Sequence, residues 1–267
     1  MKKYAVIGNP IGHSLSPVMH NAAFKEMGVD AVYEKIEVKD LAKEYEKLKD
    51  DYSGINVTIP YKLAIMELLD SKDMAAELIG AVNCVDFKDE ATSIGYNTDI
   101  TGAIDALKSK ENALKGKCVL VLGAGGAARA VVFGCALEGM EISLWNRTKD
   151  KAEALSKDLK EKLGAGATVQ KEQSLDGIDI LVNTTSVGMT PKILESPLTC
   201  KIPKDIIVMD IVYNPLETKL LRDAKTAGAM CINGLEMLVL QGAESQRIWG
   251  YDPPVEVMRK AALNELS

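Results

Sequence analysis

Polar and charged side chains interrupt an apolar segment at residues 54–63, which reads G-I-N-V-T-I-P-Y-K-L. Asn56 and Thr58 are two residues apart, so on a strand both side chains would point to the same face. Burying an amide and a hydroxyl there costs free energy unless each finds a hydrogen-bond partner. Pro60 favours an extended residue before it and a helix after it. We therefore expect Lys62 in the first turn of a helix, where the helix dipole disfavours a cation.

An amide, a hydroxyl and an ammonium group arranged in this way predict a ligand-binding site that can move a proton. The alternative is an ordinary strand, turn and helix with Lys62 in solvent. A second polar turn, G-Y-N-T-D at residues 95–99, precedes an expected helix at about 100–109. Its Asp99 is the other candidate for proton transfer, although the spacing along the chain does not establish that the two residues meet.

A glycine-rich turn carries the pattern of a dinucleotide-binding site. The sequence V-L-V-L-G-A-G-G-A-A-R-A (119–130) fits G-x-G-x-x-G/A, with Ala128 in the third position. An apolar strand precedes the turn and a helix-forming run follows it, which makes the motif specific. Glycines permit the tight turn and the close approach of a pyrophosphate to the helix N-terminus, although a purely structural turn is the alternative. The residues predicted to bind the pyrophosphate are Gly123, Ala124, Gly125, Gly126 and Ala127.

The segment after the next strand favours NADP over NAD. That strand ends near Trp145, where an NAD-selective site would offer a carboxylate to the ribose hydroxyls. Here Asn146, Arg147 and Thr148 follow instead, so a guanidinium and a hydroxyl are available for a 2′-phosphate. Arg147 could alternatively be a surface residue at a helix start, and the nearby Asp150 keeps NAD open.

The elements that position these residues alternate between short apolar strands and helical patterns, which predicts an α/β fold. Residues 4–8 form an expected first strand, and Ser16 is a candidate N-cap for a helix that begins with Pro17 and ends near Met27. Further strands are expected near 31–38, 54–59 and 81–87, and further helices near 40–50 and 61–69.

From residue 117 the strands become continuously apolar, as in a sheet that helices cover on both faces. The runs lie at 118–122, 142–145, 178–182 and 206–212. They predict a doubly wound, Rossmann-type parallel sheet. We expect a substrate-binding and catalytic domain at 1–100, completed by helices at 235–267 that return to it, and an NADP-binding domain at 101–234.

The composition of the 267 residues sets limits on the class of protein. A hydrophobic content of 47% and a net charge of −6 are typical of a globular domain and argue against nucleic acid as the main partner. No apolar run has the length of a membrane helix or a signal peptide, so we expect no membrane partner. Five scattered cysteines without a C-x-x-C pair are typical of reduced thiols in a cytoplasmic protein. The chain has only His13 and His20, which lack metal-ligand spacing, so no metal site is expected.

Taken together, the motifs resemble the shikimate dehydrogenase family, in the family's order from end to end. The matching stretches are G-N-P-I-G-H-S-L-S-P (8–17), N-V-T-I-P-Y-K (56–62), G-A-V-N (80–83), N-T-D (97–99), G-A-G-G-A-A-R-A (123–130), N-R-T (146–148), N-T-T-S-V-G-M (183–189), D-I-V-Y-N-P (210–215) and N-G-L-E-M-L-V-L-Q-G (233–242). The resemblance implies reversible, NADPH-dependent reduction of 3-dehydroshikimate to shikimate on the route to chorismate and the aromatic amino acids.

The resemblance also implies a role for each matching position. Lys62 and Asp99 would be the catalytic pair, with Lys62 as the proton donor and Asp99 as the residue that orients it and the substrate. The residues implied in substrate binding are Ser14, Ser16, Thr58, Asn83, Asp99, Tyr213 and Gln241. Those implied in cofactor binding, besides the glycine turn, are Asn146, Arg147, Thr148, Thr184, Ser186, Met189, Ile211 and Gly234.

Several of these residues have an ordinary structural alternative: Asn83 as a turn residue, Gln241 as a solvated helix residue, and Met189 and Ile211 as packing residues. Three rival functions also remain. One is a quinate/shikimate dehydrogenase that uses NAD, another is a ligand sensor without catalysis, and the third is a different dehydrogenase of similar architecture. We expect a monomer or a homodimer that binds a small-molecule substrate.

Overall fold

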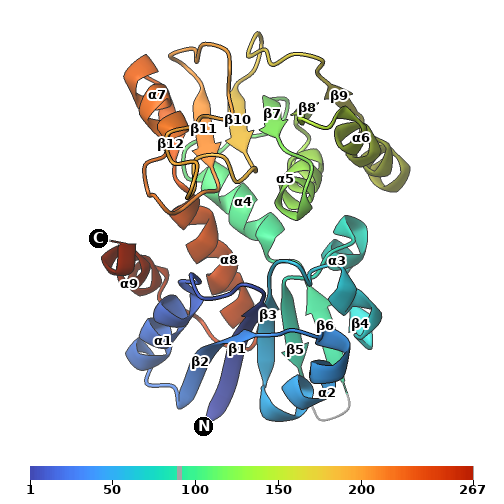
Figure 1. Ribbon diagram of the computed structural model, residues 1–267, viewed down its shortest axis with the longest axis vertical. Coiled ribbons are helices and arrows are strands. Elements are labelled where there is room, and N and C mark those ends of the chain that lie inside the picture. The colour runs from blue at the N-terminus through green and yellow to red at the C-terminus, as the bar shows by residue number, and fades with distance from the viewer. Residues whose placement is uncertain (89–91, 267) are drawn as a thin grey trace. The chain divides into compact units, whose positions relative to one another are not determined.

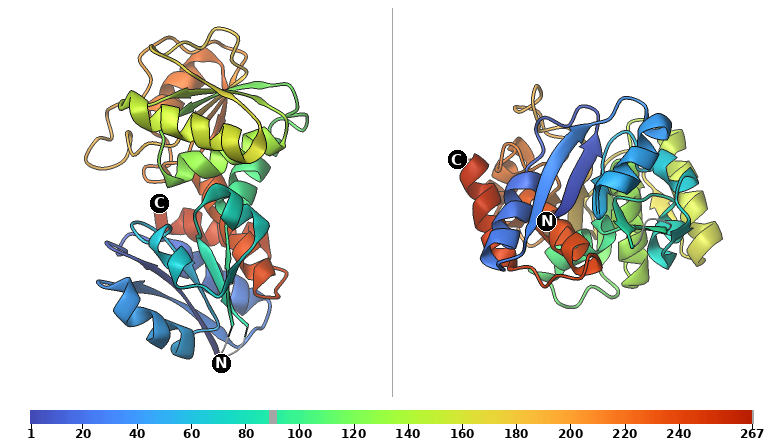
Figure 2. Two further views of the ribbon diagram at one scale, coloured as in Figure 1. Left: turned by 90° about the vertical axis from the view of Figure 1, so that its right-hand side faces the viewer. Right: turned by 90° about the horizontal axis from the view of Figure 1, so that it is seen from below.

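The computed structural model describes residues 1–88 and 92–266, and the chain divides into two compact units. Unit 1 comprises Met1–Thr101 and Val239–Glu265, and unit 2 comprises Gly102–Leu238. Each unit is built around one six-stranded sheet (Figures 1 and 2). None of the helices in these described ranges has the length and apolar character needed to cross a membrane.

The sheet of unit 1 is mixed. Its strand order is β2 (Ala31–Glu37), β1 (Lys2–Gly8), β3 (Gly54–Val57), β5 (Cys84–Phe87), β6 (Ser93–Tyr96) and β4 (Ser71–Lys72). Strands β2, β1 and β3 are parallel, whereas β5 is antiparallel to both of its neighbours, β3 and β6. The carboxyl ends of β1, β3 and β6 and the amino end of β5 therefore meet at one edge of the sheet.

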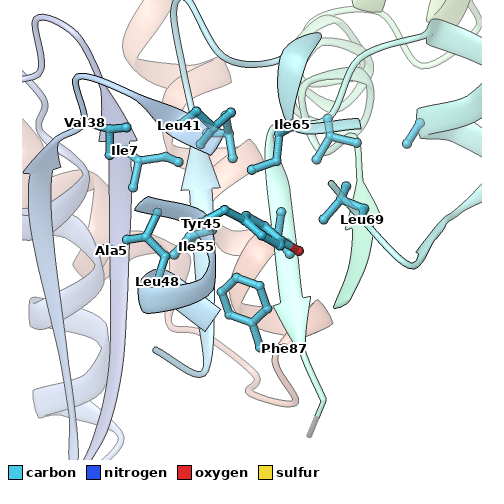
Figure 3. Close-up of a cluster of buried hydrophobic side chains, with 14 residues drawn as sticks. Ala5, Ile7, Val38, Leu41, Tyr45, Leu48, Ile55, Ile65, Leu69 and Phe87 are labelled. Carbon is cyan, nitrogen blue, oxygen red and sulfur yellow. The ribbon is translucent and has the colours of Figure 1, made fainter. Parts of the chain in front are cut away.

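Side chains along β1 point alternately to the two faces of the sheet, and each face has its own buried core in unit 1. Ala5 and Ile7 pack on one face of the sheet, together with Tyr45 and Leu48 of helix α2 (Leu41–Asp51), as Figure 3 shows. Tyr4 and Val6 lie in a second cluster of buried side chains. This is the pattern that a period of two along a strand produces when both faces of the sheet are covered.

Unit 1 contains four further helical elements, three in its N-terminal part and one near the C-terminus of the chain. They are α1 (Ser16–Glu26), the 3-10 helix η1 (Ala64–Glu67), α3 (Met74–Ile79) and α9 (Val255–Leu266). Helix α8 (Gly234–Ile248) carries the chain from unit 2 back into unit 1. After α8, Trp249 stacks on Tyr4 with ring centroids 4.5 Å apart, and its indole Nε1 donates to Val85 O at 3.1 Å. The expected return of the C-terminal helices to the first domain is confirmed.

The sheet of unit 2 is entirely parallel, which confirms the Rossmann-type prediction. Its order is β12 (Met230–Ile232), β11 (Ile207–Asp210), β10 (Ile180–Asn183), β7 (Cys118–Leu122), β8 (Glu141–Trp145) and β9 (Ala167–Val169). The chain builds outward from β7 in one direction and then from β10 in the other, so the order of winding reverses between these two strands. Ligands of open parallel sheets bind outside the carboxyl ends at such a point.

Helices connect these parallel strands. Helix α5 (Gly126–Leu137) packs on β7 and β8, α6 (Lys149–Leu163) packs on β8 and β9, and α7 (Lys219–Ala227) packs on β11 and β12. Helix α4 (Asp99–Lys108) leads from unit 1 into unit 2.

Two local predictions around the polar segments are wrong. The expected helix at 61–69 is not an α-helix: Lys62 lies in a turn, and the four-residue η1 follows it. The Lys62 carbonyl accepts from Val82 N at 2.9 Å, and the Met66 amide instead donates to Leu63 O at 3.2 Å, so the α-helical pattern is not continued. The expected conflict between Lys62 and a helix dipole therefore does not arise.

The second error concerns the start of α1. Ser16 is the first residue of that helix, not its N-cap; the cap position is Leu15, and no side chain caps it. The Ser16 hydroxyl is therefore not committed to the helix end and remains available for another partner.

Candidate active site

Lys62 and Asp99 come together in unit 1. Lys62 follows β3, and Asp99 is the first residue of α4. The Lys62 Nζ atom lies 2.5 Å from Asp99 Oδ2, and the two side chains are 21% and 10% exposed, respectively. Solvent screens such a pair less than it screens a surface ion pair, and a carboxylate is favourably placed at a helix N-terminus. The pair is thus a partly enclosed ammonium group held beside a carboxylate, an arrangement that can move a proton.

Asn83 fixes the orientation of the Asp99 carboxylate. The Asn83 Oδ1 atom accepts from the Thr98 backbone amide at 2.6 Å, which determines which way the side-chain amide faces. Its Nδ2 atom therefore donates to Asp99 Oδ1 and to Thr98 Oγ1, each at 2.9 Å. One carboxylate oxygen of Asp99 thus binds Lys62 and the other binds Asn83. Both residues sit at the sheet edge defined above, because Asn83 precedes β5 and Asp99 closely follows β6.

Gln241 of α8 reaches the same group of side chains. Its Oε1 atom lies 3.4 Å from both Asn83 Nδ2 and Thr98 Oγ1. Thr98 is a buried member of the site that the sequence prediction omitted. Its position inside the N-T-D turn, next to Asp99, was the available signal.

The loops after β1 and β3 lie side by side at this edge. Thr58 N donates to Ile7 O at 2.9 Å, and Asn9 N donates to Ile59 O at 3.0 Å. Gly8 permits this approach, because a Cβ atom there would lie 2.6 Å from Thr58 Cγ2.

The loop after β1 carries Ser14 and Ser16. The Ser16 amide donates to Ser14 Oγ at 3.3 Å, so the two serines are neighbours in space as well as in sequence. One edge of the unit 1 sheet therefore carries the hydroxyls of Ser14, Ser16 and Thr58 together with the Lys62–Asp99 pair.

In unit 2, the glycine turn leaves the start of α5 open. Gly125 is the N-cap residue of α5 and no side chain caps the helix, while a Cβ at Gly125 or Gly126 would meet nothing within 4 Å. Gly123 is required for another reason: its φ is +117°, and a Cβ there would lie 2.4 Å from Thr184 Oγ1. Thr184 Oγ1 in turn donates to Leu122 O at 2.7 Å. The ends of β7 and β10 are thus tied together beside an uncapped helix N-terminus, which suits a pyrophosphate.

The turn after β8 offers a cation and no carboxylate. Asn146 Nδ2 donates to Thr148 O at 2.7 Å, which shapes the turn that presents Arg147. Arg147 is exposed, and within residues 1–88 and 92–266 no carboxylate forms an ion pair with it. Asp150, the residue that kept NAD open, lies in the first turn of α6. These residues fit the 2′-phosphate of NADP.

A buried carboxylate holds the loops after β10 and β11. Asp210 accepts from Asn183 Nδ2 at 2.9 Å, from Thr218 Oγ1 at 2.6 Å and from the Val212 amide at 3.1 Å. Burial raises the pKa of Asp210 to about 6, against the opposing effect of these hydrogen bonds. The loops that begin at Thr184 and Ile211 are therefore anchored at their bases.

The remaining predicted residues of unit 2 differ in exposure. Ser186 and Met189 are exposed, whereas Tyr213 is half-buried. Gly234 lies against the chain at Ile211, because a Cβ at Gly234 would be 2.2 Å from Ile211 O. Tyr213 belongs to unit 2, whereas the other residues predicted to bind substrate belong to unit 1.

Comparison with known proteins agrees with this geometry. Residues 6–85 match the shikimate dehydrogenase substrate binding domain, and residues 105–215 match the shikimate / quinate 5-dehydrogenase family. Shikimate dehydrogenase (NADP(+)) of Methanocaldococcus jannaschii is 44% identical, over all of this chain and 98% of its own length. The chain belongs to the shikimate dehydrogenase family. Within the family's substrate-binding region lie Ser14, Ser16, Thr58, Lys62 and Asn83.

Solved structures of shikimate dehydrogenases have the same fold. One in complex with NADP+ superposes with a TM-score of 0.94 at 43% identity, covering all of this chain and 96% of that one. The Thermus thermophilus enzyme, in complex with NADP(H) and shikimate, gives a TM-score of 0.91 at 39% identity, covering 99% of each chain.

Proposed function

We propose that this protein is an NADP-dependent oxidoreductase that reduces 3-dehydroshikimate to shikimate, reversibly. The observation that carries the proposal is the Lys62–Asp99 pair, held by Asn83 at a sheet edge lined with hydroxyls, in a chain of the shikimate dehydrogenase family. The reaction is a step toward chorismate and the aromatic amino acids.

Lys62 supplies the proton of the reduction. NADPH, when bound, would supply the hydride for the carbonyl carbon of the substrate. Lys62 donates the proton to the carbonyl oxygen, so that hydride and proton together convert C=O into CH–OH. Asp99 holds the ammonium group in place and accepts a hydrogen bond from a substrate hydroxyl.

Neutral side chains bind the substrate. Ser14 and Ser16 each donate a hydrogen bond to its carboxylate. The ring hydroxyls are bound by Thr58, Asn83, Asp99, Tyr213 and Gln241.

NADP is held by unit 2. The turn from Gly123 to Ala127 and the N-terminus of α5 bind the pyrophosphate, and Asn146, Arg147 and Thr148 bind the 2′-phosphate. The nicotinamide end is held by Thr184, Ser186, Met189, Ile211 and Gly234. In domain terms, residues 1–100 with 235–267 bind the substrate, and 101–234 bind the cofactor.

We also propose a cytoplasmic protein that works as a monomer or a homodimer. All five cysteines are free thiols in the structure, which suits a reducing compartment.

An absorbance assay at the nicotinamide band tests the proposed activity. Shikimate and quinate are each supplied with NADP and with NAD. We expect rapid reduction of NADP with shikimate and much slower reaction in the other three combinations. Preferred use of quinate with NAD would favour the quinate/shikimate branch, and binding of shikimate without any absorbance change would favour a sensor.

Replacing Lys62 tests the proton-transfer role. For Lys62→Ala we expect kcat to fall by about 10²–10⁴-fold, the usual range for a general acid, with little change in the KM for shikimate. Lys72→Ala is the matched control, because Lys72 lies in the same unit and its Nζ donates to a backbone oxygen, Met66 O at 3.2 Å, and not to Asp99. A Lys62 variant with near-normal kcat would refute the role.

A further inference from the structure

We propose that Tyr33 and Ser245, acting through Asn56, form a buried positioning network that holds the substrate-binding side chains of unit 1 in register with one another. None of the three is expected to touch the substrate. The inference rests on the proposed function, because the residues that it positions are those assigned to the substrate.

Asn56 is the centre of the network. Its Oδ1 atom accepts from Tyr33 OH at 2.7 Å. Its Nδ2 atom donates to Ser245 Oγ at 2.8 Å and to the backbone oxygen of Asn83 at 3.0 Å. The side chain is buried, so each of these bonds replaces water that the amide has lost. The backbone oxygen of Asn83 can only accept, so it fixes the Nδ2 side of the Asn56 amide and leaves Oδ1 to accept from the Tyr33 hydroxyl.

Ser245 connects the network to α8. Its hydroxyl accepts from Asn56 Nδ2, donates to Gln241 O at 3.0 Å one helical turn earlier, and lies 3.4 Å from Thr98 Oγ1. The side chain of Ser245 is fully buried. It is thus bound to β3 on one side and to the turn before α4 on the other, and it carries Gln241 with it.

Tyr33 connects the network to α1, the helix that begins at Ser16 and carries His20 and Asn21. Burial raises the pKa of the Tyr33 phenol well above its ordinary value, so the hydroxyl keeps the proton that it donates. The Tyr33 ring is itself fixed, because it stacks on His20 with centroids 4.1 Å apart and an interplanar angle of 2°. The Tyr33 backbone is bound in both directions by the Asn21 side chain at 2.8 Å.

The network therefore joins two ends of the proposed substrate site. At one end is α1, the helix whose first residue is Ser16, and at the other are Asn83 and Gln241. Two of the sequence separations are large: 23 residues from Tyr33 to Asn56 and 189 residues from Asn56 to Ser245. A fully satisfied buried network of this kind specifies one arrangement, since any displaced member leaves an unpaired polar atom.

Removing one hydroxyl at a time tests the proposal. For Tyr33→Phe and for Ser245→Ala we expect kcat/KM for shikimate to fall by about tenfold, which corresponds to about 1.4 kcal/mol. The KM for shikimate should rise, whereas the KM for NADP should stay within twofold. The double variant should lose little more than the worse single variant, because both substitutions act through the Asn56 amide.

Tyr4→Phe is the matched control. Tyr4 lies in the same buried cluster as Tyr33, and its hydroxyl is hydrogen-bonded to Tyr251 OH at 3.1 Å, so the change costs a comparable bond outside the network. We expect its kinetic constants to stay within twofold of the wild type. Tyr33→Phe with the constants of Tyr4→Phe would overturn the network even if Ser245→Ala failed to fold. Wild-type protein that does not oxidise shikimate would refute the proposed function itself and the network with it.

Discussion

Asn83 contributes to the site with both its side chain and its backbone. The side-chain amide holds the Asp99 carboxylate, while the backbone oxygen accepts from Val57 N at 2.9 Å and from the Asn56 side chain. A substitution at Asn83 would therefore disturb β3 and the Lys62–Asp99 pair together. Lys62 is a cleaner target, since its proposed proton transfer involves only the Nζ atom.

Arg147 is the residue on which we propose that the choice of cofactor depends. For Arg147→Gln we expect the KM for NADPH to rise by about 10–100-fold, because a charge-assisted bond to a phosphate contributes about 1.5–3 kcal/mol. The KM for NADH should hardly change, as NADH has no 2′-phosphate. Initial rates with the two cofactors measure the effect.

Arg222→Gln is the control for this substitution. Arg222 is also exposed and lies in the same unit, where its Nη1 atom donates to Glu217 O at 2.9 Å. Equal effects of the two substitutions on NADPH would show that general surface charge, not Arg147, attracts the cofactor.

At the scale of elements, long apolar runs predicted the fold well. The run at 118–122 became β7, whose last four residues are buried, and the run at 142–145 lies within β8. Short apolar runs of this kind are typical of strands in a sheet that helices cover on both faces. The two-residue β4 and the six-residue α3 were not predicted, because so few residues show no periodicity.

The candidate site likewise has residues that the sequence predicts and contacts that it does not. Motif positions such as Lys62 and Asp99 could be predicted, but the turn around Lys62 could not, because Val82 N, from a distant segment, decides it. Tyr33 and Ser245 carry no motif at all. Their roles depend on contacts between residues far apart in the chain, which one sequence does not reveal.

The turn between β7 and α5 allows a test of one element. Gly123→Ala places a Cβ against Thr184 Oγ1 at a φ that L-residues rarely adopt, so we expect a loss of about 1–3 kcal/mol in unfolding free energy and weaker NADP binding. Gly166→Ala is the matched control, because nothing lies within 4 Å of that Cβ and its φ lies outside the left-handed region. Chemical denaturation and NADP titration measure both. Equal behaviour of the two variants would contradict the steric argument.

At the scale of the whole molecule, each unit contains one tryptophan: Trp145 in unit 2 and Trp249 in unit 1. Trp249 lies near His20, with ring centroids 5.8 Å apart. A Trp145→Phe variant therefore leaves a fluorescence signal that reports on unit 1 alone.

His20 makes the stability of unit 1 sensitive to acid. Burial lowers its pKa to about 3, whereas an unfolded histidine titrates near 6.5. Between these values the unfolded chain binds the proton and the folded chain does not, so the free energy of unfolding falls as pH decreases. The loss between pH 7 and pH 5 should be about 2 kcal/mol.

Urea denaturation of the Trp145→Phe protein at the two pH values measures this loss. His20→Asn in the same background should reduce it, since Asn does not titrate. An unchanged pH dependence in that variant would assign the effect to other groups.

Asp210 in unit 2 acts with the opposite sign: its raised pKa makes unit 2 lose stability as pH increases toward about 6.

The order of the two units along the chain bears on how the protein is made. Unit 2 is a continuous stretch, Gly102–Leu238, inserted between the two parts of unit 1. A ribosome therefore synthesises all of unit 2 before it reaches Ser245 and Trp249, and domains fold as they emerge. During translation the first 101 residues must wait, with Tyr4 and Val85 uncovered, until Trp249 leaves the exit tunnel.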